Sequence, residues 1–298
     1  MNLENITYGI IGLGLMGGTI AKSLRKNVLS ENKSENQCAK IIALDKNKES
    51  LENALSEKII DSYFLPEETK KMLLQCDVVF ICLYPHATLD FLLQNKENFK
   101  SGSIITDISG VKGIFEKKLP SLLRSDVDFI IGHPMAGGEK EGYSSSNSSF
   151  FNGRNYILIP ENFNKKENLD FFKKLIYKMG FSKITETTAG DHDYKIGFTS
   201  QLCHVIASAL VESAPDEKIT AFGGGSFEDL TRIAMINAPL WTELFISNKE
   251  KLTVHIENFI AQMNEFKNLI QKEDKTALEN LLKDVREKRS LMGGTKKN

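Results

Sequence analysis

The sequence predicts an α/β fold built on a mostly parallel sheet, followed by an all-helical domain. Three observations predict it. Short, continuous apolar runs alternate with amphipathic stretches, a glycine-rich turn follows the first of these runs, and beyond about residue 187 only helical periodicity remains. Continuous apolar runs are typical of strands that are covered on both faces, and alternation of strands with helices produces parallel sheets.

The first part of the chain contains the predicted strands. We expect strands at residues 6–11, 40–44, 78–83, 103–107, 128–132, 155–159 and 182–186. Amphipathic stretches separate many of them, for example 16–26 and 169–179, and these are expected to be the crossover helices of βαβ units.

The second part is expected to be helical throughout, with helices at 191–213, 226–237 and 240–247. One apolar face then recurs at steps of three or four residues, as a long helix requires, in Leu252, Ile256, Phe259, Met263, Phe266 and Ile270. We therefore place one domain at residues 1–188 and a helical domain at 189–298. The helical part has more apolar surface than so small a domain needs to cover itself, which predicts a homodimer through this domain.

Composition excludes several classes of function. Lys and Arg number 38 against 39 Asp and Glu, a net charge of -1, so a basic face for non-specific nucleic-acid binding is not expected. No apolar run approaches the ~20 residues of a membrane helix, and no secretory signal precedes the first strand. None of the four cysteines forms a CxxC pair, so we expect neither a metal site nor disulfides, and we place the protein in the cytoplasm.

The glycine-rich turn predicts a dinucleotide-binding Rossmann domain. Gly12, Gly14 and Gly17, with Leu15 and Met16 between them, follow the first strand and open a helix. The first glycine permits a tight turn, the second lets the backbone approach a pyrophosphate, and the third allows close packing of the helix on the strand. The amides at the helix N-terminus then face the phosphates. A glycine turn in an unrelated α/β protein is the alternative interpretation.

Asp45, at the end of the second predicted strand, favours NAD over NADP. A carboxylate there accepts hydrogen bonds from the ribose hydroxyls and repels a 2′-phosphate. It lies 28 residues after Gly17, a longer spacing than the usual ~20 residues, and the polar stretch 29–37 accounts for the excess as a loop insertion. The alternative for Asp45 is a simple turn residue.

Two further segments follow predicted strands and point to a reaction. Thr106-Asp107-Ile108-Ser109-Gly110-Val111-Lys112 follows one, and Gly132-His133-Pro134-Met135-Ala136-Gly137-Gly138-Glu139 follows another. Ligands of doubly wound sheets bind at the carboxyl ends of the strands, which is where Ser109 and His133 are expected. His204 lies on the predicted long helix, and Phe227-Glu228-Asp229-Leu230-Thr231-Arg232 lies further along.

Taken together, these segments resemble the prephenate/arogenate dehydrogenase family of tyrosine biosynthesis. The resemblance runs in order over nearly the whole chain: GLGLMGG, TDISGVKG, GHPMAGGEKEG, the helix around SQLCH, and FEDLTRIA with Trp241 nine residues after Arg232. It implies a Rossmann domain and a helical dimerisation domain. It also implies NAD-dependent oxidative decarboxylation of prephenate to 4-hydroxyphenylpyruvate, with arogenate as the alternative substrate.

The resemblance also implies roles for single residues. His133 matches the catalytic histidine that hydrogen-bonds the 4-hydroxyl of the substrate, and Ser109 matches the residue that links histidine, nicotinamide and substrate. Substrate-contacting positions are matched by His204, Arg232 and the backbone of Gly225, and a gating acid by Glu139. Asp193 and Trp241 match residues near the site or its dimer surface.

Some alternatives stay open on the residues alone. His204 and Trp241 would ordinarily be core residues, Arg232 would lie on a solvated face, and His192 is expected to be a surface or structural residue. A β-hydroxyacid dehydrogenase also has a Rossmann domain followed by helices, and a dinucleotide-sensing regulatory protein would explain the glycine turn. The length leaves no room for an added regulatory or mutase domain, so an enzyme with one activity is expected.

Overall fold

The computed structural model describes residues 3–29, 39–116, 118, 122, 124–138 and 140–292. Contacts within the chain divide it into two compact units, Met1–Asn248 and Lys249–Asn298. The predicted insertion at 29–37 falls almost entirely outside the described residues. The predicted domain boundary after residue 188 stays a prediction.

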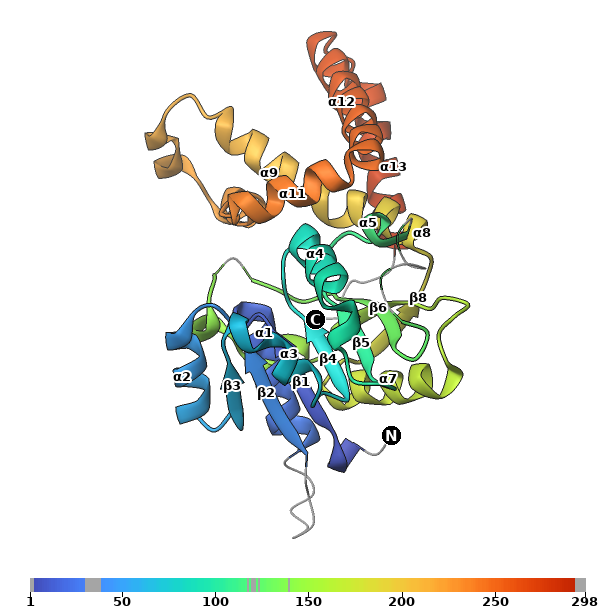
Figure 1. The fold of residues 1–298 in the computed structure, drawn as a ribbon. Coiled ribbons are helices and arrows are strands. Elements are labelled where there is room, and N and C mark those ends of the chain that lie inside the picture. The colour runs from blue at the N-terminus through green and yellow to red at the C-terminus, as the bar shows by residue number, and fades with distance from the viewer. Residues whose placement is uncertain are drawn as a thin grey trace. The chain divides into compact units, whose positions relative to one another are not determined.

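The first unit is built on a β-sheet, which Figure 1 shows. Among the described residues this sheet has eight strands. Its strands are β1 Thr7–Ile11, β2 Lys40–Leu44, β3 Ser62–Phe64, β4 Val78–Ile81, β5 Ile104–Asp107, β6 Asp128–Pro134, β7 Asn155–Ile159 and β8 Lys183–Glu186. The order across the sheet is β3-β2-β1-β4-β5-β6-β7-β8. All neighbouring pairs are parallel except β6 and β7, which are antiparallel. The predicted mostly parallel sheet is therefore confirmed, and all seven predicted strands form.

Helices cover both faces of this sheet, which explains why the strands are continuous apolar runs. One apolar layer packs the sheet against α1 (Leu15–Ser23), α2 (Lys48–Ser56) and α7 (Lys166–Lys178). The other packs it against α3 (Thr69–Leu73), α4 (Pro85–Asn95) and α5 (Gly113–Glu116). Within β1, Ile10 belongs to the first layer and Ile11 to the second, as the two-residue repeat of a strand requires.

Helices follow the sheet in the first unit. They are α8 (Ala189–Ile196), α9 (Leu202–Glu212), α10 (Gly225–Thr231) and α11 (Ala238–Ser247). A π-helical turn, Gly197–Gln201, joins α8 to α9. The long helix predicted at 191–213 therefore forms, with one wide turn in its middle. Thr188 caps it, because its side chain accepts the N–H of Asp191 at 3.2 Å.

The second unit is a pair of helices, α12 (Lys249–Gln271) and α13 (Lys275–Leu291), which pack on each other. Glu273, with a φ of 52°, makes the turn between them. No strand forms between residues 187 and 292, as predicted. Within the described part of the chain, no helix is both long and apolar enough to cross a membrane.

Candidate active site

The predicted site residues gather at one edge of the sheet. The glycine turn follows β1, Asp45 follows β2, Ser109 follows β5 and His133 lies near the end of β6. Because these strands are parallel, their carboxyl ends lie at the same edge. The strand order reverses between β1 and β4, and ligands of such sheets bind at this switch point.

The glycine turn has the geometry that a pyrophosphate cradle needs. Gly12 has a φ of +88°, and a Cβ added there would lie 2.7 Å from the carbonyl oxygen of Cys82 in the neighbouring chain segment. A Cβ on Gly17 would lie 1.9 Å from the carbonyl oxygen of Gly12, so only glycine lets α1 start this close to β1. The position of a Cβ on Gly14 meets no described atom within 4 Å, and no side chain caps the helix there. Open space beside uncapped amides, with Leu15 and Met16 beginning α1, fits a dinucleotide phosphate.

Asp45 fixes the glycine turn to the end of β2. Its Oδ2 accepts the N–H of Leu13 at 2.5 Å, and its Oδ1 accepts the N–H of Asn47 at 2.7 Å. Each carboxylate oxygen has a further lone pair, and the side chain is half-buried. Asp45 is therefore placed to accept the hydroxyls of a ribose that lies over the turn.

Ser109 has a buried hydroxyl with an unused hydrogen-bonding capacity. The residue is 4% exposed, and its Oγ has no hydrogen-bond partner among the described residues. Its backbone N–H donates to Oδ2 of Asp107 at 2.9 Å, which holds the turn after β5. A Cβ on the next residue, Gly110, would lie 3.9 Å from Cε1 of His133. An unpaired buried hydroxyl is unfavourable, so its presence beside His133 fits a site that a ligand completes.

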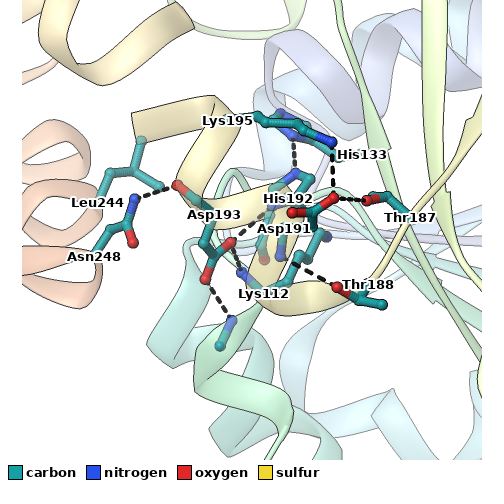
Figure 2. Close-up of polar contacts among 12 residues, drawn as sticks. Lys112, His133, Thr187, Thr188, Asp191, His192, Asp193, Lys195, Leu244 and Asn248 are labelled. Atoms are coloured by element: carbon teal, nitrogen blue, oxygen red, sulfur yellow. Dashed lines mark hydrogen bonds and ion pairs between the residues drawn. The ribbon is translucent and has the colours of Figure 1, made fainter. Parts of the chain in front are cut away.

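His133 is the first residue of a hydrogen-bonded series that runs into the helical part of the unit (Figure 2). Its Nδ1 lies 2.9 Å from Nε2 of His192, and Nδ1 of His192 lies 2.8 Å from Oδ1 of Asp193. His133 is half-buried on β6, whereas His192 and Asp193, on α8, are almost fully buried. His192 is therefore buried, and the expectation of a surface residue is wrong.

The surroundings keep His133 neutral. Burial lowers the pKa of His133 well below its ordinary value, and repulsion from a protonated His192 and from the ammonium of Lys112 adds to the shift. Burial also lowers the pKa of His192, although the hydrogen bond to Asp193 opposes the shift. A neutral imidazole has a bare nitrogen that can accept a proton at physiological pH.

Asp193 anchors the series to both parts of the unit. Its Oδ1 accepts the N–H of Lys112 at 2.8 Å and its Oδ2 accepts the N–H of Gly113 at 2.7 Å. Burial raises the pKa of Asp193, but these bonds and the bond from His192 outweigh burial, and the net shift is downward. Asn248 donates its amide N–H to the backbone carbonyl of Asp193 at 2.8 Å. The carboxylate is therefore ionised and held on several sides.

A buried ion pair contacts the strand that contains His133. The ammonium of Lys112 lies 2.6 Å from Oδ2 of Asp107, and neither side chain is exposed. The same ammonium donates to the carbonyl oxygen of Gly132 at 2.6 Å. The pair thus connects the end of β5 to β6 at the residue that precedes His133.

His204 and Trp241 form a second cluster. Their rings stack with centroids 3.6 Å apart, and Nδ1 of His204 lies 2.9 Å from the carbonyl oxygen of Ser200. Both rings are half-buried, on α9 and α11. Gly225 begins α10, and Arg232 follows its end with an exposed side chain. The substrate-binding roles of His204, Gly225 and Arg232 stay predictions.

Glu139 lies outside the described residues, and its gating role stays a prediction. Its close neighbour Glu141 is described, and Oε1 of Glu141 accepts the side-chain amide of Asn237 at 2.7 Å. The same amide lies 2.8 Å from the hydroxyl of Tyr84. Glu141 therefore contacts the residue that caps α11.

Two family models together match most of the chain. Residues 29–184 match the family model described as the nucleotide-binding domain of prephenate dehydrogenase, and residues 188–284 match its dimerization domain. The chain belongs to the prephenate dehydrogenase family. The resemblance inferred from the motifs is thereby confirmed.

Alignments with individual relatives cover nearly all of the chain. Prephenate dehydrogenase of Lactococcus lactis is 30% identical over 291 residues, which are 95% of this chain and 76% of that protein. A crystal structure of the Aquifex aeolicus prephenate dehydrogenase with hydroxyphenyl propionate and NAD⁺ has a TM-score of 0.85 at 30% identity, covering 98% of this chain and 100% of that chain. Synechocystis arogenate dehydrogenase has a TM-score of 0.77 at 22% identity, covering 97% and 100%, and shares the fold.

Three members of the site in this dehydrogenase chain carry no distinctive sequence pattern. Asp107 and Lys112 lie within the motif around Ser109 but had no predicted role, and His192 was assigned no chemistry. His192 lies 59 residues from His133 in sequence, so only the fold brings them together. The resemblance already points to Asp193, and the position of His192 directly before it, near the start of a predicted helix, is the signal that could have found His192.

Proposed function

We propose that this chain catalyses the NAD-dependent oxidative decarboxylation of prephenate to 4-hydroxyphenylpyruvate in tyrosine biosynthesis. The observation that carries the proposal is that a neutral His133 and the unpartnered hydroxyl of Ser109 lie at the same sheet edge as the glycine turn. Family membership and the ligands named for the Aquifex aeolicus structure support the same reaction.

Prephenate has a hydroxyl on ring carbon C4 and a carboxylate on the opposite ring carbon. Removal of a hydride from C4 and of the hydroxyl proton makes a ketone, and loss of CO₂ then makes the ring aromatic. Bound NAD supplies the hydride acceptor. The protein must accept the hydroxyl proton, hold C4 in place and hold two carboxylates.

His133 serves as the proton acceptor in this proposal. Its neutral ring accepts a hydrogen bond from the 4-hydroxyl and takes the proton as the hydride departs. Ser109, buried beside it, donates or accepts a hydrogen bond that positions the hydroxyl and the nicotinamide amide. Asp45 and the amides after Gly14 bind the ribose and the pyrophosphate.

The substrate carboxylates need cations or donors. Arg232 is suited to grip a carboxylate with two parallel N–H bonds, which a lysine does less well. His204, the backbone of Gly225 and Glu139 complete the proposed substrate contacts, and Glu139 controls entry. These assignments rest on the match to the family motifs, position by position.

We also propose that the active form is a cytoplasmic homodimer. Large apolar side chains of the helical part of the first unit are exposed in the single chain, among them Phe222 at 90% and Met235 at 78%. Such surface in a folded protein is typical of an interface, and the second family model describes a dimerization domain. Light scattering on the full chain, compared with its 33.4 kDa monomer mass, tests this, and a monomer at micromolar concentration contradicts it.

The direct test of the reaction follows NADH at 340 nm with prephenate, with arogenate and with neither. The proposal expects NADH and 4-hydroxyphenylpyruvate from prephenate. Turnover of arogenate alone would instead favour the arogenate dehydrogenase alternative. Turnover of neither substrate would contradict the proposal and leave a β-hydroxyacid dehydrogenase or a dinucleotide sensor to be tested.

A further inference from the structure

We infer that His192 and Asp193 are positioning residues that fix the tautomer of His133 and leave the lone pair of its Nε2 available to the substrate hydroxyl. The inference rests on the proposed function and adds to it the residues that make His133 an acceptor. It follows from the proton that each hydrogen bond in Figure 2 requires.

The carboxylate of Asp193 is only an acceptor. Both oxygens of Asp193 accept backbone N–H groups, from Lys112 and Gly113, and backbone N–H groups are always donors. The contact of 2.8 Å between Oδ1 and Nδ1 of His192 therefore needs its proton from the imidazole. Nδ1 of His192 thus carries a hydrogen.

The two imidazole rings share one proton at their contact. Nε2 of His192 and Nδ1 of His133 lie 2.9 Å apart, a hydrogen-bond distance that holds one proton. Two fully protonated rings would place N–H against N–H at this distance, so both cannot be charged. With His192 neutral, its Nε2 is the acceptor and Nδ1 of His133 is the donor. Nε2 of a neutral His133 then has the lone pair.

The charged groups around the rings support this state. The ammonium of Lys112 binds the carbonyl oxygen of Gly132, next to His133. Its charge disfavours a second positive charge on either ring. Asp193 faces His192, whereas Asp107 is already paired with Lys112. A neutral pair of rings between an ionised carboxylate and the substrate is the arrangement that results.

The anchoring makes the series rigid. Asn248 holds the backbone carbonyl of Asp193 and also donates to the side-chain carbonyl of Gln201 at 2.7 Å, with both amides buried. Asp193 is therefore fixed both to the turn that precedes α5 and to the π-helical turn. Rings held in this way lose little freedom on substrate binding, which keeps the reacting lone pair in place.

His192 is the better position for a test, because Asp193 also holds the backbone of Lys112 and Gly113. His192→Leu removes the acceptor for Nδ1–H of His133, whereas the side-chain carbonyl in His192→Gln can restore it. His86→Gln is a control for the histidine-to-glutamine exchange, since His86 is exposed and its ring contacts Ser247 rather than His133 or His192. All variants are first checked for folding and for NADH binding.

Nitrogen-15 spectra of the imidazoles give the readout that a merely structural role would not change. Without substrate, we expect His133 to carry its proton on Nδ1 in the wild type, His86→Gln and His192→Gln. In His192→Leu we expect the proton to move to Nε2 in a substantial fraction of molecules. A proton on Nε2 of His133 in the wild type would overturn the inference.

Kinetics give the second readout. A wrong tautomer in a catalytic histidine lowers kcat by up to ~10⁴-fold with the geometry intact. We expect His192→Leu to lower kcat by about 10²–10⁴-fold with little change in KM, and His192→Gln to recover at least roughly tenfold of that loss. Wild-type kcat in His192→Leu would overturn the inference. An inactive wild type with the expected spectra would instead refute the proposed reaction.

Discussion

Lys112 and Asp107 form an ion pair with no exposed surface, 2.6 Å apart, and the ammonium also binds the strand that carries His133. Burial lowers the pKa of Lys112, and the charge of Asp107 opposes that shift. Because the ammonium also binds the carbonyl oxygen of Gly132, the pair fixes the backbone next to His133.

Lys112→Met should therefore destabilise the fold. The substitution leaves the carboxylate of Asp107 buried without its cation, and breaking a buried pair in this way costs about 3–5 kcal/mol of unfolding free energy. Lys100→Met is the control, because Lys100 pairs with Asp77 at the same 2.6 Å but is 43% exposed. That exposed pair should contribute at most about 1 kcal/mol. Urea denaturation of both variants is the measurement, and equal losses would contradict the role given to burial.

Asp45 should set the preference for NAD over NADP. Its charge repels a 2′-phosphate, so Asp45→Asn should narrow the ratio of kcat/KM between the two cofactors while the amide still accepts one backbone N–H. Asp45→Ala should narrow the ratio and also raise KM for NAD, because the N–H of Leu13 loses its acceptor. An unchanged ratio in both variants, or a wild-type preference for NADP, would show that the assignment is wrong.

The pH dependence of kcat/KM should report a neutral His133. The ring accepts a proton only when it is uncharged, and its pKa lies well below the ordinary 6.5. Activity should therefore stay level as pH falls to 6.5 and decline only at lower pH, where the ring becomes protonated. The facing groups are His192, Lys112, Asp107 and Asp193. An acid limb with its midpoint at or above pH 6.5 would contradict the neutral state derived from burial.

Arg232 should act on binding more than on chemistry. An interaction with a carboxylate that is equally strong in the ground and transition states lowers KM and leaves kcat unchanged. Arg232→Ala should therefore raise KM for prephenate. Loss of a charge-assisted bond of about 1.5–3 kcal/mol corresponds to a rise of roughly ten- to a hundred-fold. NADH affinity should not change, and Lys174→Ala, an exposed residue of α7, should leave both constants unchanged. A normal KM in Arg232→Ala would remove Arg232 from the site.

Much of the fold could be read from the sequence, because buried parallel strands are continuous apolar runs. The ranges of β2 and β7 agree with the predicted ones residue for residue. The three-residue edge strand β3 was missed, since Ser62–Phe64 is too short to show a pattern. The antiparallel pairing of β6 with β7 also has no local signature, because strand direction depends on the connection.

The site was predicted only in part, for a physical reason. Gly12, Gly17, Asp45, Ser109 and His133 are recognisable because each lies at or just beyond the end of a strand or opens a helix. His192 and Lys112 act through contacts with residues distant in sequence or through burial, and neither leaves a periodic pattern. A buried lysine in particular looks like any exposed lysine until its partner Asp107 is placed beside it.

The kcat of His133→Asn is the most direct test of the proposed chemistry. His133 contributes as the hydroxyl proton leaves, so its removal should lower kcat by about 10²–10⁴-fold and change KM little. NADH binding should be unaffected, because the glycine turn and Asp45 carry it. The measurement is steady-state formation of NADH with saturating prephenate and NAD, on a variant shown to be folded. A kcat near that of the wild type would contradict the assignment of His133 as the proton acceptor.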